Sequence, residues 1–314
     1  MLWDERIGRR LKLRDLHILM SVAQCGTMGK AAAQLAISQP AVSKAISDIE
    51  HTLKVRLLDR TARGVEPTLY GRSLLKWGVV VFDDLRQSVK EIEHLADPTV
   101  GELRIGCTEP MAWGIVPAVI ERLTQKYPRL VFHVTQTDPG TLRYRELRER
   151  NVDLVIGRIA GAMQDEEITV EILFDEKASV VAGLKNRWVG RRKIELAELA
   201  DEPWTLPPAD SFAGSLLRDA FRACGLAAPR INAVAFSIPL HNALLASGRF
   251  LTVLPGSLLR YSANRMSLKI LPVVLPIRPG PVGILTLKNR TLSPIAQLFF
   301  ECAREVAKPL VNTR

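Results

Sequence analysis

The chain has 314 residues, 47% of them apolar, which is more than one hydrophobic core usually organises, so two or more globular domains are expected. No uncharged apolar run of about eighteen residues occurs, which excludes a membrane-spanning helix, and the charges within the first six positions argue against a secretory peptide. We therefore expect a cytoplasmic protein. The net charge of +10 suggests a polyanionic partner, but most of the excess falls after residue 98, so charge alone does not locate the contact.

The side chains that most often carry catalysis are dispersed. The four cysteines, at positions 25, 107, 224 and 302, have no paired spacing and no histidine cluster nearby, so we predict free thiols, no metal site and no cofactor. The five histidines are scattered, and no Gly-x-Ser-x-Gly, His-Glu-x-x-His or phosphate-loop motif occurs. The sequence does not predict an enzyme.

Three short helical patterns open the chain. The first stops at Gly26, which suits the left-handed position after a helix, and Thr27 can cap the second. Ser38 can cap a third helix, whose first turn tolerates Pro40. The third helix has an apolar stripe of Val42, Ala45, Ile46, Ile49 and Leu53. Three helices in about forty residues predict a helix-turn-helix unit whose last helix enters the DNA major groove.

A hairpin-like wing is predicted after the third helix. Its two strands, residues 56–59 and 65–68, are joined through Arg63-Gly64, with Arg60 and Arg63 at the tip. Ahead of the first helix, basic residues at positions 6, 9, 10 and 12 form an arm. The sequence supports two interpretations of this arm equally: contact with a DNA backbone, or simple exposure to solvent.

Five motifs follow one another between residues 13 and 71. They are Ala31-Ala32-Ala33-Gln34-Leu35, Ser38-Gln39-Pro40-Ala41-Val42-Ser43-Lys44, Ile49-Glu50, Leu57-Leu58-Asp59-Arg60 and Pro67-Thr68-Leu69-Tyr70-Gly71. Together they resemble the amino-terminal domain of LysR-type transcriptional regulators. One departure is Leu58, where the family usually has phenylalanine. The resemblance implies a DNA-binding regulator with a separate effector-binding half.

The polar residues of this region divide by chemistry. Gln39 and Lys44 carry groups that can meet base edges. The candidate phosphate contacts are Ser38, Ser43, Arg60, Arg63 and Thr68. Ser38 can equally serve as a helix cap only. The resemblance supports a role in DNA binding for Gln39, Pro40, Ser43 and Lys44.

A long helix is predicted from residue 68 to Asp97-Pro98, because proline disfavours helix in the residue before it. Its apolar residues repeat at heptad spacing, which indicates a coiled-coil seam. The predicted contacts are Leu75, Phe82, Leu85, Val89 and Ile92. We therefore expect a homodimer or homotetramer, the alternative being a helix packed against its own domain.

From residue 101 strands alternate with helices, which predicts a parallel sheet with crossover helices and ligands beyond the carboxyl ends of its strands. The resemblance adds a periplasmic-binding-protein-like arrangement: lobe I at about 99–176 and 279–314, lobe II at about 177–278, and a ligand cleft between them. The expected fold class is α/β with an all-α winged helix-turn-helix domain (1–68), a coiled-coil linker helix (69–98) and a two-lobed effector domain (99–314).

Polar residues stand where the strands of both lobes end. The candidate effector contacts are Thr108, Glu109, Thr137, Asp138, Arg158, Leu206 and Ser237. Glu109 and Asp138 would repel an anion unless Arg158 or Arg143 offsets them, so a neutral polyol such as a sugar, or a cation, is as compatible as an aromatic acid. Ordinary turn and cap residues are the alternative. Cys107 has no cysteine partner in the adjoining loops, so we predict that it is not a redox sensor.

The sequence thus predicts a sequence-specific DNA-binding transcriptional regulator that responds to a sugar-like or carboxylate metabolite. Its expected partners are double-stranded DNA, the effector and further copies of the chain, with RNA polymerase as another candidate and no membrane. A solute-binding protein, or a small-molecule enzyme with the same two-lobed fold, is the alternative. The helical front of the chain argues against the solute-binding protein.

Overall fold

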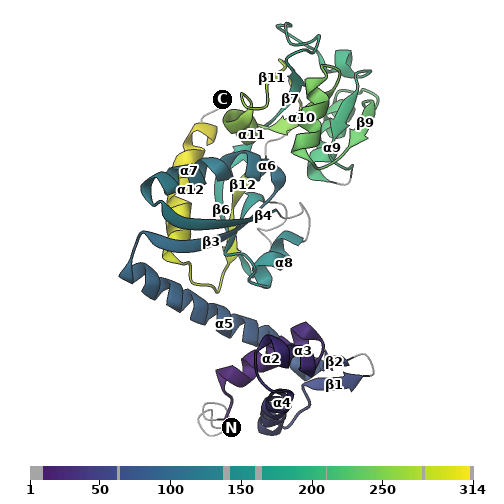
Figure 1. Ribbon diagram of the computed structural model, residues 1–314. Helices are drawn as coiled ribbons and strands as arrows, with labels where there is room; N and C mark the ends of the chain where they lie inside the picture. The colour runs from purple at the N-terminus through teal and green to yellow at the C-terminus, as the bar shows by residue number, and fades with distance from the viewer. Residues whose placement is uncertain are drawn as a thin grey trace. The chain divides into compact units, whose positions relative to one another are not determined.

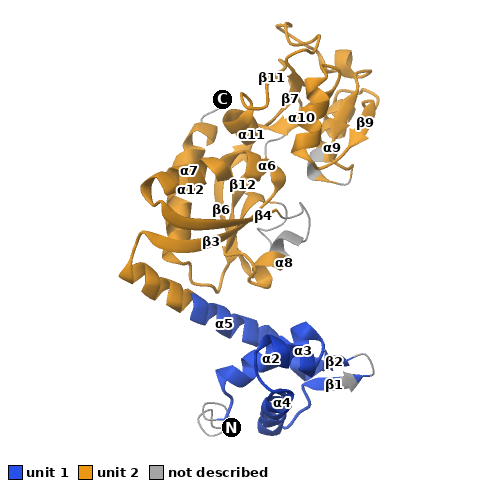
Figure 2. Ribbon diagram, in the orientation of Figure 1, with its two compact units in different colours: residues 1–86 blue, residues 87–314 orange. Residues whose placement is uncertain are grey.

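The computed structural model describes residues 10–61, 64–136, 142–159, 165–209, 211–277 and 280–311. The chain divides into two compact units, residues 1–86 and 87–314 (Figures 1 and 2). The first contains a winged helix-turn-helix, and the second contains two five-stranded sheets. No helix within the described ranges is long and apolar enough to cross a membrane.

The first unit packs three helices around one apolar cluster. Gly26, at φ 70°, ends the first helix, and the hydroxyl of Thr27 accepts the Lys30 N–H at the start of the second. The elements are α2 (Leu13–Cys25), α3 (Met28–Gln34), α4 (Gln39–Leu53), β1 (Leu58–Thr61), β2 (Gly64–Pro67) and the start of α5 (Leu69–Ala96). The buried residues of α4 are Val42, Ala45, Ile46 and Ile49, which confirms the predicted stripe.

The wing is an antiparallel hairpin in which Leu58 pairs with Pro67 and Thr61 with Gly64. Its first strand begins two residues later than predicted. The reason is Glu50, whose Oε1 accepts the N–H of Leu57 at 2.7 Å and that of Leu58 at 3.3 Å, so the chain just before β1 is tied to α4. Leu58, at the usual phenylalanine position, is buried in the same core. Arg63 lies outside the described residues.

Part of the predicted seam of α5 packs against the other helices of the first unit. Leu75 and Phe82 are half-buried against the core formed by α2 to α4. A Cβ on Gly78 would lie 3.1 Å from the Met20 Sδ, so this position also faces the same unit. Leu75 and Phe82 therefore pack within their own unit, and their place in a dimer seam stays a prediction. The large apolar and aromatic residues that α5 leaves exposed are Leu69, Tyr70, Trp77, Val81, Leu85, Val89, Ile92 and Leu95.

The first sheet of the second unit has the strand order β4-β3-β5-β12-β6. The strands are β3 (Val100–Cys107), β4 (Arg129–Gln136), β5 (Leu154–Arg158), β6 (Ile168–Glu176) and β12 (Gly280–Leu287). The strand β3 runs parallel to β4 and β5, whereas β12 runs antiparallel to β5 and β6. The predicted parallel arrangement of the strands between residues 101 and 159 is confirmed, whereas the sheet as a whole is mixed, because the last strand returns from the second sheet in the opposite direction.

Helices cover both faces of the first sheet (Figure 1). One face packs against α7 (Ile115–Lys126) and α12 (Pro294–Val311), and the other against α8 (Leu142–Arg148). Alternate residues of β5 enter the two cores: Leu154 and Ile156 join one cluster, while Val155 joins the other. This explains why β5 is a continuous apolar run.

The second sheet has the order β11-β7-β10-β8-β9 and is also mixed. Its strands are β7 (Ala178–Gly183), β8 (Trp204–Leu206), β9 (Ile231–Val234), β10 (Leu251–Pro255) and β11 (Leu268–Ile270). One core lies under the short η2 (Leu196–Leu199) and α9 (Phe212–Ala223). The other lies under α10 (Ile238–Ala246) and α11 (Gly256–Ser262).

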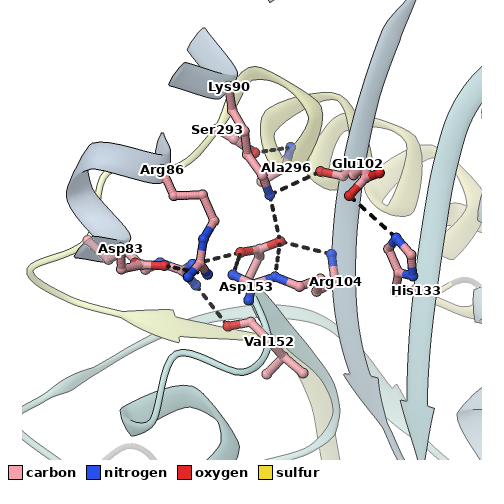
Figure 3. A network of polar contacts seen from close by, with 11 residues as sticks. Asp83, Arg86, Lys90, Glu102, Arg104, His133, Val152, Asp153, Ser293 and Ala296 are labelled. Atoms are coloured by element: carbon pink, nitrogen blue, oxygen red, sulfur yellow. Dashed lines mark hydrogen bonds and ion pairs between the residues drawn. The ribbon is translucent and has the colours of Figure 1, made fainter. Parts of the chain in front are cut away.

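A buried carboxylate holds several elements of the second unit together (Figure 3). Asp153 accepts the backbone N–H of Arg104 at 2.8 Å, the Arg104 Nη2 at 2.7 Å and the Arg290 Nη2 at 2.6 Å. The Lys90 Nζ of α5 lies 3.5 Å away. Burial opposes ionisation of Asp153, but the hydrogen bonds from Arg104 and the charges of Lys90 and Arg290 together hold its pKa below the ordinary value.

Replacing Asp153 by asparagine should lower the free energy of unfolding of the second unit by about 3 kcal/mol at neutral pH, because buried cations lose their counter-charge. The folded pKa is lower than the unfolded one, so the ionised carboxylate stabilises the fold above pH 3.8 and this contribution is lost as the pH falls further. Urea unfolding of wild type and Asp153→Asn should therefore differ less in acid. Glu305→Gln, at an exposed ion pair, is the control and should change little.

Candidate functional site

The exposed face of α4 gathers most of the predicted DNA-reading residues. Ser38 caps the helix, its Oγ accepting the Ala41 N–H at 3.4 Å. Gln39, Pro40 and Lys44 are exposed, and Ser43 is half-buried. Because the opposite face of α4 is fixed in the core, these side chains lie on a rigid surface at the amino end of the helix. The structure thus brings the α4 residues of the predicted site together.

Two further candidates for phosphate contact, Thr68 and Arg60, lie outside α4. The Thr68 hydroxyl donates to the Arg56 carbonyl at 2.8 Å and accepts the Gly71 N–H at 3.0 Å, so it caps α5. Its single proton is therefore engaged, and its role as a donor to phosphate is corrected. Arg60 lies in β1, but its side chain is outside the described part of the chain.

The predicted effector residues of lobe I begin where β3 ends. Thr108 occupies the cap position of α6 (Glu109–Trp113), yet its hydroxyl makes no capping bond. The residue is 9% exposed, and its hydroxyl has no hydrogen-bond partner among the residues that the structure describes. Thr108 thus places a hydroxyl next to the one carboxylate of α6.

A hydrogen bond joins the two lobes at this point. The Ile238 N–H, at the start of α10, donates to the Glu109 Oε1 at 3.1 Å. Trp113, at the other end of α6, packs in the cluster that contains Ile238 and Leu258, and its carbonyl accepts the Ser262 hydroxyl. The short helix α6 therefore contacts both α10 and α11 of lobe II. Ser237 caps α10 through the Leu240 N–H.

Other predicted effector residues lie elsewhere. Leu206 is fully buried in the core under α9, so its assignment as an effector contact is corrected: its side chain serves packing. Arg158 lies against Gly280, and its charge acts on the buried carboxyl of Glu176. Thr137, Asp138 and the side chain of Arg143 lie outside the described residues. The structure thus brings together Thr108, Glu109 and Ser237 from the predicted set.

A buried histidine behind Ser237 was missed by sequence reasoning. His241 is 1% exposed, and its ring lies between the Thr205 Oγ1 at 2.7 Å and the Ala235 carbonyl at 2.9 Å. Burial lowers the pKa of His241, so the ring is neutral near pH 7. It donates from Nε2 to Ala235 and accepts from Thr205. Its place one turn after the Ser237 cap was the only signal in the sequence.

Two cavities of about 310 and 320 Å³ are present in the second unit. The first lies among β6, β12 and α12, and the second among β6, β7 and α11. Neither is lined by a predicted effector residue. The larger one is bordered by Glu176, which accepts the Ser257 hydroxyl and N–H, so its buried carboxylate already has partners.

Comparison with known proteins matches both units. Residues 13–72 match the family model described as a bacterial regulatory helix-turn-helix protein of the lysR family, and residues 96–308 match the LysR substrate binding domain. The regulator GbpR of Azospirillum brasilense is 31% identical over 92% of this chain and 84% of its own. The transcriptional dual regulator GltC of Bacillus subtilis is 28% identical over 93% and 96%.

Solved structures share the fold of the whole chain. Full-length CbnR, crystallised with its target DNA, is 21% identical and covers 94% of this chain and 100% of its own with a TM-score of 0.64. A full-length OxyR variant from Pseudomonas aeruginosa is 20% identical, covers 96% and 98%, and has a TM-score of 0.66. At this level of identity the likeness concerns the fold alone.

The thiol of Cys107 should be unreactive in the folded protein, because it is fully buried and burial raises its pKa to about 12. Cys224 is exposed and serves as the internal control. With Ellman's reagent or peroxide, mass spectrometry should find Cys224 modified first and Cys107 only after denaturation. Modification of Cys107 at the rate of Cys224 would contradict the prediction that it is not a redox sensor.

Proposed function

Because the chain belongs to the LysR family of bacterial transcriptional regulators, we propose that it is a sequence-specific regulator whose DNA binding is modulated by a small metabolite held between lobes I and II. The observation that supports DNA reading best is α4, which buries one stripe and exposes Gln39, Pro40 and Lys44 at its amino end. We assign DNA reading to residues 1–68, assembly to 69–98 and effector binding to 99–314. Its place of action is then the cytoplasm.

In this proposal some residues of α4 contact bases and others contact phosphates. Gln39 offers an amide that can bond both N6 and N7 on the major-groove edge of an adenine, and Lys44 offers a donor for guanine. Ser38, Ser43 and the wing arginines Arg60 and Arg63 contact phosphates and fix the register. Val42 and Ile46 are buried in the core of the first unit and thereby fix the position of α4 within it.

For the effector, the proposal relies on the end of β3 and the start of α10. The hydroxyl of Thr108 and the carboxylate of Glu109 stand where strands of a sheet of this kind present ligands. A ligand that bonds groups of both lobes favours one arrangement of the lobes, and a helix leading from the DNA-reading domain can pass that bias on. Both a sugar-like and a carboxylate metabolite fit this outline.

Replacing Gln39 by alanine should weaken binding to the preferred DNA sequence by about 1–3 kcal/mol and relax preference at one base pair, since a base-edge contact is lost. Binding to unrelated DNA should remain. Selection from genomic fragments, followed by titration of the selected site, measures both. Gln24→Ala, at an exposed position of α2, is the matched control. Equal loss on all sequences would contradict base reading by Gln39, and failure of the wild type to select any fragment would refute the proposed function.

Assembly is proposed to use the exposed part of α5. Leu85, Val89 and Ile92 are 43%, 53% and 65% exposed, and burial of such a row against a second copy is favourable. The double change Leu85→Asp and Ile92→Asp should separate the copies, because like charges would meet in the seam. Sedimentation should then show the mass of one chain. The exposed Glu93→Gln is the control, and an unchanged mass of the double variant would place assembly elsewhere.

A further inference from the structure

We propose that the loop between β7 and η2 in lobe II, residues 185–193, is a second surface for nucleic acid, which binds the phosphates of double-stranded DNA without reading their sequence. Five residues of this loop are basic and none is acidic. The basic residues are Lys185, Arg187, Arg191, Arg192 and Lys193. The loop thus carries much of the positive charge that the chain has after residue 98, which the proposed contacts of α4 and the wing leave unexplained.

The first observation is that buried residues tie this loop to its lobe. Asn186, Trp188 and Ile194 are 5%, 7% and 3% exposed. The Trp188 N–H donates to the Asn186 Oδ1 at 3.0 Å, and backbone bonds from Val189 to Asn186 and from Arg191 to Trp188 close successive turns. All of the basic residues between these anchors are exposed. The loop therefore presents its cations on a structured surface.

The second observation is that most of these cations lack a counter-charge. Arg187 pairs with Glu202, and Lys193 pairs with Glu195. The other three form no ion pair within the ranges that the structure describes; they are Lys185, Arg191 and Arg192. Like charges held close together repel one another, and a polyanion removes that cost.

Neighbouring elements place further cations beside the loop. A Cβ on Gly248 would lie 3.0 Å from the Lys185 Cβ, so the turn before β10 contacts the loop, and the exposed Arg249 follows directly. The strand β11 pairs with the last residues of β7 and carries the exposed Lys269. These segments meet where β7 ends and β10 begins, which is the end of the second sheet opposite to the one where α10 and α11 begin. The surface is therefore separate from the proposed effector site.

The indole of Trp188 points to an anion independently of the charge count. Its Nε1 is buried and has no hydrogen-bond partner among the residues described. The guanidinium carbons of Arg187 and Arg191 lie 5.4 and 5.7 Å from the centroid of its ring. A buried donor without an acceptor costs free energy. A phosphate held by these two arginines is an acceptor that the loop itself lacks.

The chemistry of the loop favours a duplex over a single strand. Single strands are bound by exposed aromatic rings that stack on their bases, and the one aromatic ring of the loop belongs to the buried Trp188. Cations without such a ring fit a phosphate backbone. A duplex that α4 already holds is present at high effective concentration, so even weak contacts of this kind add affinity; this last step rests on the proposed function.

The salt dependence of DNA binding tests the proposal in the full chain. Each phosphate contact contributes about 0.9 to the slope of log affinity against log salt concentration. Arg191→Gln combined with Arg192→Gln should therefore make the slope for a duplex of scrambled sequence less steep by about 2. Changing both residues to lysine keeps the charge and should retain most of the slope. The matched control is Arg122→Gln with Lys126→Gln, which removes two exposed cations from α7 of lobe I and should leave the slope as in wild type.

Arginine footprinting tests the contact directly. Phenylglyoxal modifies exposed guanidinium groups, and mass spectrometry should find that the scrambled duplex slows modification of Arg191 and Arg192 in wild type but not that of Arg122. An unchanged slope in the Arg191→Gln, Arg192→Gln variant would overturn the proposal, as would protection of these arginines by phosphatidylserine vesicles but not by the duplex. The variant should select the same genomic fragments as wild type, because α4 is unaltered. Failure here is therefore distinguishable from failure of the proposed function, in which wild type selects no fragment.

Discussion

The ionised carboxylate of Asp153 is the contact on which the arrangement of the second unit depends most. It joins the end of α5 through Lys90, the strand β3 through Arg104 and the segment after β12 through Arg290. Because these cations are largely buried, none of the elements can shift far without leaving a charge uncompensated. The strand β3 also leads directly to Thr108, so one element is shared by the charge cluster and the proposed effector site.

The sequence predicted those elements that a local pattern determines. The stripe of α4, the caps Thr27 and Ser38, and the end of α5 before Asp97-Pro98 follow from residues within one or two turns. The first strand of the wing begins two residues later than predicted, because Glu50 holds the chain before β1. The mixed direction of the sheets depends on which strands meet, and no local pattern contains that information.

The candidate site was predicted in part for the same reason. The positions of Ser237 and Thr108 could be predicted because each stands between a strand and a helix. Leu206 was misassigned, because a strand end near the rim and a core position look alike in sequence. The sequence could not decide what Leu75 and Phe82 of α5 contact, since one apolar face of a helix can pack against its own domain or another chain. The contact between Glu109 and Ile238 joins residues 129 positions apart, so only the structure could reveal it.

That contact changes how the charges of the effector region are understood. From the sequence, Glu109 was a repulsive group that needed a cation beside it. In the structure its charge faces the amino end of α10, where backbone amides and the helix dipole stabilise a carboxylate without any cation. The buried, neutral His241 fixes the Ala235 carbonyl just before that helix, which holds the Ser237 cap in place. The electrostatic environment of Glu109 thus depends on backbone geometry as much as on the neighbouring side chains.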